Sequence, residues 1–332
     1  MLFIICPACG ILEEKAGAPG FPGKGEGMNI SDIETFLMLV RTRNITKTAE
    51  SLYVSQPTVS HRLKLLENEL GVVLLSRRKG YKKVELTAKG EEFVPIAERW
   101  LALMNETMAL QTTGEFHRLS IGCTNTLNAS SMAELYRRIS INPDYRLNMK
   151  ITTHYSFQIY ELVENHGLDV GFVFHNLHFK NIDSEPVLRE KMFLVQEASG
   201  AVPGERVPVE KLDLGREVCL VWETNYQIWH DQNVTKGRPV HIEVDIYDLL
   251  EELIRVPGAW TIAPASVAYK LRERTGAVIS RISSRQSPPD RTTYRIVHRD
   301  MSESKRQALS VFETVMREYF AEKGWEYLGS NH

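Results

Sequence analysis

Cysteine is scarce in this sequence, and the four that occur exclude a disulfide framework. Cys6 and Cys9 form a lone Cys-x-x-Cys pair, and a zinc site needs a second ligand pair that the neighbouring sequence lacks. We therefore expect no metal and no cofactor. Residues 2–12 are apolar, but they are too short to span a bilayer and no basic segment precedes them. No secretory signal and no membrane partner is expected, which favours the cytoplasm.

The sequence also lacks the motifs of common enzyme classes. It has no G-x-G-x-x-G behind a strand, no G-x-x-x-x-G-K-[ST], no H-E-x-x-H and no G-x-S-x-G. Cys123 and His154 have the residue types of a nucleophile and its base, but core filling and ligand lining account for them more simply. We expect no enzymatic activity; an enzyme for a small metabolite, fused to a DNA-binding domain, is the alternative.

A large excess of charge is absent as well, because 40 Lys and Arg oppose 42 Asp and Glu and leave a net charge of −2. The distribution is nevertheless uneven, since residues 41–90 hold eleven Lys and Arg against four acids. A basic segment on an acidic body is typical of a DNA-reading domain attached to a module with another task.

Two short helices joined by a tight turn are predicted within residues 44–70, which is the pattern of a helix-turn-helix. Asn44 can cap the first helix and Ser55 the second, whose first turn accepts Pro57 because a missing N–H costs little there. Gly71 ends the second helix. The apolar residues of this helix recur at helical spacing and predict a buried face, formed by Val59, Leu63, Leu66 and Leu70.

Polar side chains occupy the opposite face of the second helix, where Gln suits adenine and Arg suits guanine. Residues 74–87 then combine basic side chains, a Gly and a short apolar alternation, which predicts a β-hairpin wing whose cations contact phosphates. A solvated helix face and a charged loop are the alternatives. The expected DNA-binding residues are Thr46, Ser55, Gln56, Pro57, Thr58, Ser60, His61, Arg62, Lys64, Arg77, Arg78, Lys79, Lys82 and Lys83.

This pattern resembles the N-terminal domain of LysR-type transcriptional regulators, over about residues 28–111. Arg43 stands where that family usually has Gly, Thr48 where it usually has Ala, and Leu75 where Phe is common. None of the three replaces a predicted DNA contact. The matching positions include Phe36, Ala49, Leu52, Ser55-Gln56-Pro57, Val59-Ser60, Leu66-Glu67, Leu70-Gly71, Leu86-Thr87 and Gly90.

Thr87 can cap a long helix that continues to about Gln111. The apolar residues of this helix recur at spacings of three and four and need a partner surface, either the chain's own domain or the same helix of a second protomer. We expect the second, and in the resembled family these helices pair antiparallel between protomers. The dimerisation stripe consists of Phe93, Ala97, Trp100, Leu101, Met104 and Met108.

Strand and helix patterns alternate through the C-terminal half, which predicts an α/β sheet with right-handed crossovers. Two such sets resemble the two-lobed, periplasmic-binding-protein-like effector domain of the same family. The expected fold is a mainly α winged helix-turn-helix N-terminal domain plus an α/β two-lobed C-terminal domain. The expected divisions are a disordered extension at 1–27, the winged domain at 28–86, a linker at 87–113 and the effector domain at 114–332, with lobe I at about 116–190 and 287–332 and lobe II at about 191–286.

Ligands of open α/β sheets bind at the carboxyl ends of strands. Hydroxyls and helix N-terminal amides at these ends favour an anionic group, and aromatic rings favour a flat or apolar remainder. Each residue taken alone is more simply a turn or a cap. The expected effector-binding residues are Thr124, Asn125, Thr126, His154, Tyr155, Ser156, Phe174, His175, Trp222, Thr224, Asn225, Tyr226, Asp245, Trp260 and Thr261.

Together these features predict a sequence-specific transcriptional regulator. A small anionic or aromatic effector would shift an equilibrium between two assembly geometries and so change how the promoter is bound. An architectural DNA binder without an effector is the third possibility, and the two-lobed body argues against it. The expected partners are double-stranded promoter DNA, the effector, RNA polymerase and further copies of the chain, as a homodimer or a dimer of dimers.

Overall fold

The computed structural model describes residues 29–77, 84–111, 117–199, 201–220 and 222–329. The chain divides into two compact units, Met1–Ala97 and Glu98–His332, and each is described by itself. Among the described residues, no helix is both long and apolar enough to cross a membrane. The expected extension at 1–27 lies outside the described residues.

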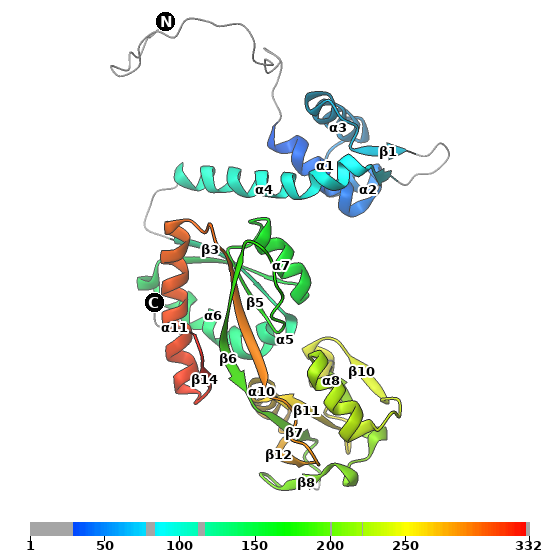
Figure 1. Cartoon of the computed structure of the whole chain (residues 1–332), viewed down its shortest axis with the longest axis vertical. Helices are drawn as coiled ribbons and strands as arrows, with labels where there is room; N and C mark the ends of the chain where they lie inside the picture. The colour runs from blue at the N-terminus through cyan, green and yellow to red at the C-terminus, as the bar shows by residue number, and fades with distance from the viewer. Residues whose placement is uncertain (1–28, 78–83, 112–116, 200, 221, 330–332) are drawn as a thin grey trace, which may run out of the picture. The chain divides into compact units, whose positions relative to one another are not determined.

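Within residues 29–77 and 84–97, the first unit has three helices, a two-stranded hairpin and the start of a long helix (Figure 1). Its helices are capped as the sequence predicts: the side chain of Asn44 accepts the N–H of Lys47, and the side chain of Ser55 accepts the N–H of Thr58. The elements are α1 Ile30–Thr42, α2 Ile45–Ser51, α3 Gln56–Leu70, β1 Leu75–Arg77, β2 Val84–Leu86 and α4 Ala88–Gln111.

The wing and the long helix meet at Thr87, which forms the predicted cap of α4 by accepting the N–H of Gly90 at 2.9 Å. β1 and β2 pair antiparallel, with Leu75 opposite Leu86. Phe36 of α1 and Phe93 of α4 lie with their rings 5.3 Å apart in the core of the unit. The predicted hairpin is thus confirmed where its strands pair, while residues 78–83 between them lie outside the described residues.

The second unit begins with a six-stranded mixed sheet of order β14-β6-β13-β5-β3-β4 (Figure 1). β3 runs parallel to β4 and β5, whereas β13 runs antiparallel to β5 and β6. Its strands are β3 His117–Cys123, β4 Leu147–Thr153, β5 Val170–Val173, β6 Ile182–Glu190, β13 Arg291–His298 and β14 Glu326–Tyr327.

Helices cover both faces of this sheet. Leu135 of α6 and Phe312 of α11 pack in one apolar cluster, and Ile159 of α7 packs in another with Val173 and Ile296. Because each face is covered, the strands of the middle of the sheet are apolar on both sides. The helices are α6 Ala133–Ile141, α7 Ser156–Glu164 and α11 Glu303–Glu322, with the shorter α5 Asn125–Leu127, the π-helix η1 Asn128–Met132 and the 3-10 helix η2 Pro143–Tyr145.

A four-stranded sheet of order β11-β7-β12-β8 and a parallel pair β9·β10 form the second lobe. Trp222, Trp229 and Trp260 lie in its single apolar cluster. The strands are β7 Met192–Gln196, β8 Arg206–Pro208, β9 Val218–Leu220, β10 Ile242–Val244, β11 Trp260–Pro264 and β12 Val278–Ser283. The helices are α8 Thr224–His230, α9 Tyr247–Leu253 and α10 Ala265–Thr275, with the π-helix η5 Asp231–Thr235 and the 3-10 helices η3 Val209–Lys211 and η4 Leu214–Arg216.

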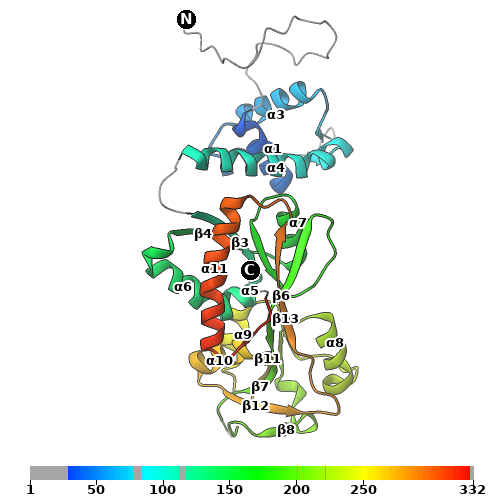
Figure 2. The ribbon, with the colours of Figure 1, turned by 60° about the vertical axis from the view of Figure 1, so that its left-hand side comes forward.

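The chain passes between the two lobes twice, from β6 into β7 and from β12 into β13 (Figure 2). The two crossings lie side by side, because Glu190 at the end of β6 is in register with Arg291 at the start of β13. The strand ranges fall within the lobe ranges expected from the sequence. The predicted fold class is therefore confirmed, and the crossings bring a buried acid and a buried cation to the junction of the lobes.

Candidate DNA-binding and effector sites

The polar face of α3 is accessible in the folded unit. Gln56, His61 and Lys64 are exposed, and Thr58 and Arg62 are half-buried, so none of these side chains is sealed in the core. Val59, Leu63 and Leu66 are buried on the opposite face as predicted, while Leu70 is only half-buried. A helix with one packed face and one polar face has the form that enters the major groove.

Two of the predicted DNA-binding side chains have a structural task of their own. The hydroxyl groups of Ser55 and Thr58 lie 2.8 Å apart, and that of Ser55 caps α3. Thr46 and Pro57 are exposed beside them. Their contacts with DNA remain predictions, as does that of Ser60, which is half-buried.

Arg62 also contacts a neighbouring helix of the same unit. Its Nη1 atom donates to Oγ1 of Thr35 in α1 at 3.4 Å, and its charge opposes the rise that burial causes in the pKa of Asp32. The side chain is half-buried, and its contact with DNA remains a prediction.

The basic wing can be followed only in part. Arg77 is the last residue of β1. The remaining predicted phosphate contacts, Arg78, Lys79, Lys82 and Lys83, lie outside the described residues.

The expected dimerisation stripe on α4 also needs a correction. Phe93 packs on Phe36 inside the first unit, and Ala97 is fully buried within one chain, so neither is available to a partner. Trp100, Leu101 and Met104 are half-buried, and the side chain of Met108 lies outside the described part of the helix. Among the described side chains of α4, Ile96 and Leu103 are instead the large apolar ones that are exposed, at 59% and 52%.

A buried ion pair lies at the end of lobe I where the chain crosses to lobe II. Nη2 of Arg291 lies 2.6 Å from Oε2 of Glu190 and 3.2 Å from Oγ of Ser266, the second residue of α10. Oε1 of Glu190 accepts the N–H of Ser266 at 2.7 Å. The hydroxyl of Ser130 from lobe I lies 3.2 Å from that of Ser266. The crossing strands and α10 are thus tied together by one polar network.

Arg291 keeps two donors unused in this network. Its Nε and Nη1 atoms are buried and have no hydrogen-bond partner among the described residues. The guanidinium carbon lies 4.5 Å from the ring centre of Phe174 and 5.1 Å from that of Trp222, so aromatic rings from both lobes flank it. A buried donor without a partner is costly, and a planar guanidinium suits a carboxylate that accepts two parallel hydrogen bonds.

Other polar atoms at the junction are unpartnered as well. Oγ1 of Thr124, at the end of β3, and Oγ1 of Thr261, in β11, are buried without a hydrogen-bond partner among the described residues. Burial raises the pKa of Glu223 to about 7, and the nearby charge of Arg291 opposes this rise. At neutral pH the Glu223 carboxyl group is therefore protonated in part of the molecules, which lowers the average negative charge that an incoming anion meets.

The predicted effector residues fall into two groups. Phe174 and Trp222 flank Arg291, and Thr124 and Thr261 have buried hydroxyl groups without a partner among the described residues. Asn125 accepts the N–H of Tyr247 at 2.8 Å, and the hydroxyl of Tyr155 lies 3.4 Å from Asp245, so these residues connect the lobes. The effector contacts of the remaining residues stay predictions. Of these residues, Thr126 is buried, His154 and Ser156 are half-buried, and His175, Thr224 and Asn225 are exposed.

Tyr226 and Trp260 require a correction. The ring of Tyr226 packs on Trp229 and His230, and Nε1 of Trp260 donates to the carbonyl oxygen of Asp213 at 2.7 Å. Both side chains fill the core of lobe II and are withdrawn from the effector site. Arg291, Glu190 and Glu223, by contrast, were not predicted, since no local pattern distinguishes them from other charged residues near strand ends.

The alternative of a nucleophilic Cys123 loses its chemical basis. The side chain is fully buried, and burial raises its pKa far above the ordinary value of a thiol, with the charge of Arg291 acting weakly in the other direction. A thiol of this kind stays protonated at neutral pH and is a poor nucleophile.

A helix-turn-helix unit joined to a two-lobed α/β unit defines the class of ligand-responsive DNA-binding regulators. The family model described as "Bacterial regulatory helix-turn-helix protein, lysR family" matches residues 30–91, and that of the "LysR substrate binding domain" matches residues 112–321. The chain belongs to the LysR family of bacterial regulatory proteins.

Individual relatives are distant. The uncharacterized regulator YraN of Bacillus subtilis (strain 168) is 24% identical over 235 residues, which are 68% of this chain and 77% of YraN. HdfR of Escherichia coli O45:K1 is 35% identical over 127 residues, 37% of this chain and 44% of HdfR. The crystal structure of full-length CbnR with its target DNA has a TM-score of 0.60 at 21% identity and covers 88% of this chain and all of CbnR. At that identity the likeness concerns the fold.

Proposed function

We propose that this chain regulates transcription by binding promoter DNA through α3, and that an anionic small molecule at Arg291 controls the binding. Membership of the LysR family and the exposed polar face of α3 support the DNA-binding half of the proposal. Gln56, His61 and Lys64 are the side chains that would reach base edges or phosphates. A homodimer would present two such helices to a site of twofold symmetry.

The observation that carries the effector half is the pair of unused donors on a fully buried arginine. An anionic group such as a carboxylate would accept a charge-assisted hydrogen bond from Nη1 or Nε of Arg291, which point to different sides of the guanidinium, and Phe174 and Trp222 would cover an apolar remainder. The bound anion would bridge groups from both lobes. Its affinity would therefore differ between lobe arrangements, which is the condition for a ligand to shift a conformational equilibrium.

The test is footprinting of the full-length protein on DNA upstream of its own and neighbouring genes, with a panel of carboxylates and their neutral amides. We expect at least one carboxylate to change the footprint while its amide does not. Arg291→Lys keeps one charge and removes the Nε and Nη1 donors, so it should abolish the response but leave the ligand-free footprint intact. Lys180→Ala, an exposed cation of the same unit, is the control. A protected site that no anion alters, or a response that survives Arg291→Lys, would contradict the proposal.

A further inference from the structure

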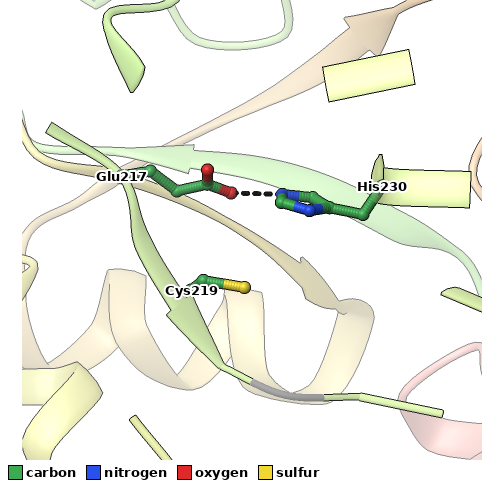
Figure 3. A group of neighbouring side chains, drawn as sticks. All are labelled: Glu217, Cys219 and His230. Carbon is green, nitrogen blue, oxygen red and sulfur yellow. Dashed lines mark hydrogen bonds and ion pairs between the residues drawn. The ribbon is translucent and has the colours of Figure 1, made fainter. Parts of the chain in front are cut away.

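Three side chains with metal-binding atoms converge inside lobe II (Figure 3). Glu217 and Cys219 are two residues apart where the chain runs extended into β9, so both point to the same face. His230 is the last residue of α8 and faces them. The ligand atoms, one carboxylate oxygen, one thiol sulfur and one imidazole nitrogen, all lie within 4.8 Å of one another.

The carboxylate of this trio is only half satisfied. Oε1 of Glu217 lies 2.6 Å from Nε2 of His230. Oε2 is buried and has no hydrogen-bond partner among the described residues. The side chain of Glu217 is only 1% exposed, so bulk water does not reach this oxygen. Removing a carboxylate oxygen from water without a partner is costly. The Cys219 thiol donates a long, 3.9 Å hydrogen bond to the carbonyl oxygen of Leu220. Oε2 of Glu217 is therefore the ligand atom of the trio that these hydrogen bonds leave unexplained.

The surroundings hold the three groups in place. The ring of Tyr226 stacks on that of His230 with centroids 5.6 Å apart, and His230 leads directly into the π-helix η5. Such π-helical turns are rare, and they often occur at functional sites. On β10, Glu243 is in register with Cys219 and is exposed, so it offers a further acid near the mouth of the site.

We propose that Glu217, Cys219 and His230 bind a divalent transition-metal ion of borderline softness, of which Zn²⁺ is the model, with water in the fourth position. Thiolate, imidazole and carboxylate together are the ligand set of zinc, and they disfavour Mg²⁺ and Ca²⁺, which prefer oxygen alone. In a tetrahedral zinc site the ligand atoms are about 3.3–3.7 Å apart. The three ligand atoms lie within 4.8 Å of one another, so small side-chain movements would bring them to these distances. The ion would take the place of the proton between His230 and Glu217, and the sulfur of Cys219 would move toward it.

A cysteine thiol must release its proton to solvent when its sulfur coordinates a metal ion, so binding at Cys219 displaces one proton. The site does not depend on the function proposed above, although Trp222 and Glu223 lie in the short segment between Cys219 and His230.

Cobalt is the direct probe, since Co²⁺ takes the place of Zn²⁺ and its thiolate complexes absorb in the near ultraviolet. The full-length chain should carry Cys6→Ser and Cys9→Ser, which removes the amino-terminal Cys-x-x-Cys as a competing site. We expect one Co²⁺ per chain, a sulfur-to-cobalt charge-transfer band, and loss of this band when Zn²⁺ is added. Cys219→Ser should abolish the band, and His230→Gln should weaken Zn²⁺ binding by at least about 100-fold.

Cys123→Ser is the matched control, because Cys123 is also buried and free but lies in lobe I, outside the trio. It should keep the band unchanged. Circular dichroism of each variant verifies folding, and His230→Gln with unchanged sulfur decides the question if Cys219→Ser fails to fold. Absence of the band in the Cys6→Ser/Cys9→Ser chain, or a band that Cys219→Ser and His230→Gln leave intact, would overturn the proposal.

Discussion

Gly90 is the position where one added methyl group should have the clearest effect on the DNA-binding unit. It lies in the first turn of α4, against the end of the wing. A Cβ atom there would overlap the carbonyl oxygen of Leu74 and lie 2.8 Å from Cδ2 of Leu86. The Leu86 side chain can move, but the Leu74 carbonyl cannot move freely, because it accepts the N–H of Thr87 at 3.0 Å.

Two effects of Gly90→Ala oppose each other. Helix propensity favours Ala over Gly by about 1 kcal/mol. Overpacking in a close contact costs roughly 1–3 kcal/mol, and the hydrogen bond to Leu74 adds about 0.5–1.5 kcal/mol if it is lost. The steric effect is the larger, so we expect a net loss of about 2 kcal/mol in the free energy of unfolding of the first unit.

Hydrogen exchange followed by mass spectrometry, on peptides from residues 30–77 of the full-length protein, measures this change locally. A loss of about 2 kcal/mol should accelerate exchange in α1 and α3 by roughly 20- to 30-fold. Glu91→Ala, an exposed neighbour in the same helix turn, should leave exchange nearly unchanged. Exchange that is equal or slower in Gly90→Ala would refute the close packing of α4 on the wing.

Three further predictions concern single residues. Arg43 has φ +49° at the C-cap of α1, a conformation that Gly adopts without steric cost. Arg43→Gly should therefore stabilise the first unit by about 1 kcal/mol in the same exchange experiment. Arg41→Gly, within the helix, should destabilise it. Arg291→Met leaves Glu190 buried without its cation and should lower the free energy of unfolding of the second unit by about 3–5 kcal/mol. Adding Glu190→Gln should restore part of this loss. Tryptophan fluorescence during denaturation measures the change, because all five Trp lie in the second unit. The pKa of Glu223 is about 7 in the folded protein and 4.5 ordinarily, so the fold loses stability as the pH rises between these two values. Glu223→Gln, which cannot lose a proton, should therefore increase the melting temperature at pH 7.5 and leave it unchanged below pH 4.5. A gain that is already present at pH 4 would contradict this assignment.

The features that the sequence predicts well are local. Asn44, Ser55 and Thr87 cap helices through backbone atoms at most three residues away, so their pattern is visible without knowledge of the fold. The same holds for Arg43: the family position usually held by Gly adopts the left-handed conformation that explains this preference.

The features that escaped prediction depend on distant contacts. Glu190 and Arg291 are 101 residues apart and meet because two strands cross between the lobes in register. The sequence of β6 has no clear strand pattern, because Asp183, Glu185 and Pro186 interrupt its apolar residues, and its partner β13 provides the pairing. Glu217 and Cys219 form an unremarkable pair until α8 places His230 above them.

The same reasoning explains the corrections. Phe93 and Ala97 fit a helical stripe, but periodicity alone does not say whether the surface that covers a stripe belongs to the same chain. Tyr226 and Trp260 lie near strand ends and have aromatic rings, and only the packing of lobe II shows that both fill its core.

Selection of binding sites from a pool of random DNA sequences by the full-length protein tests the central claim most directly. If the exposed face of α3 reads DNA, the selected sequences should share two half-sites of opposite orientation, and Gln56→Ala should relax the preference at one position of each half-site. Glu69→Ala, exposed at the far end of the same helix, should select the same sequences as the unaltered protein. If the unaltered protein enriches no sequence, the account is contradicted. The same holds if the enriched sequence stays unchanged in Gln56→Ala and also in variants with substitutions of His61 and Lys64.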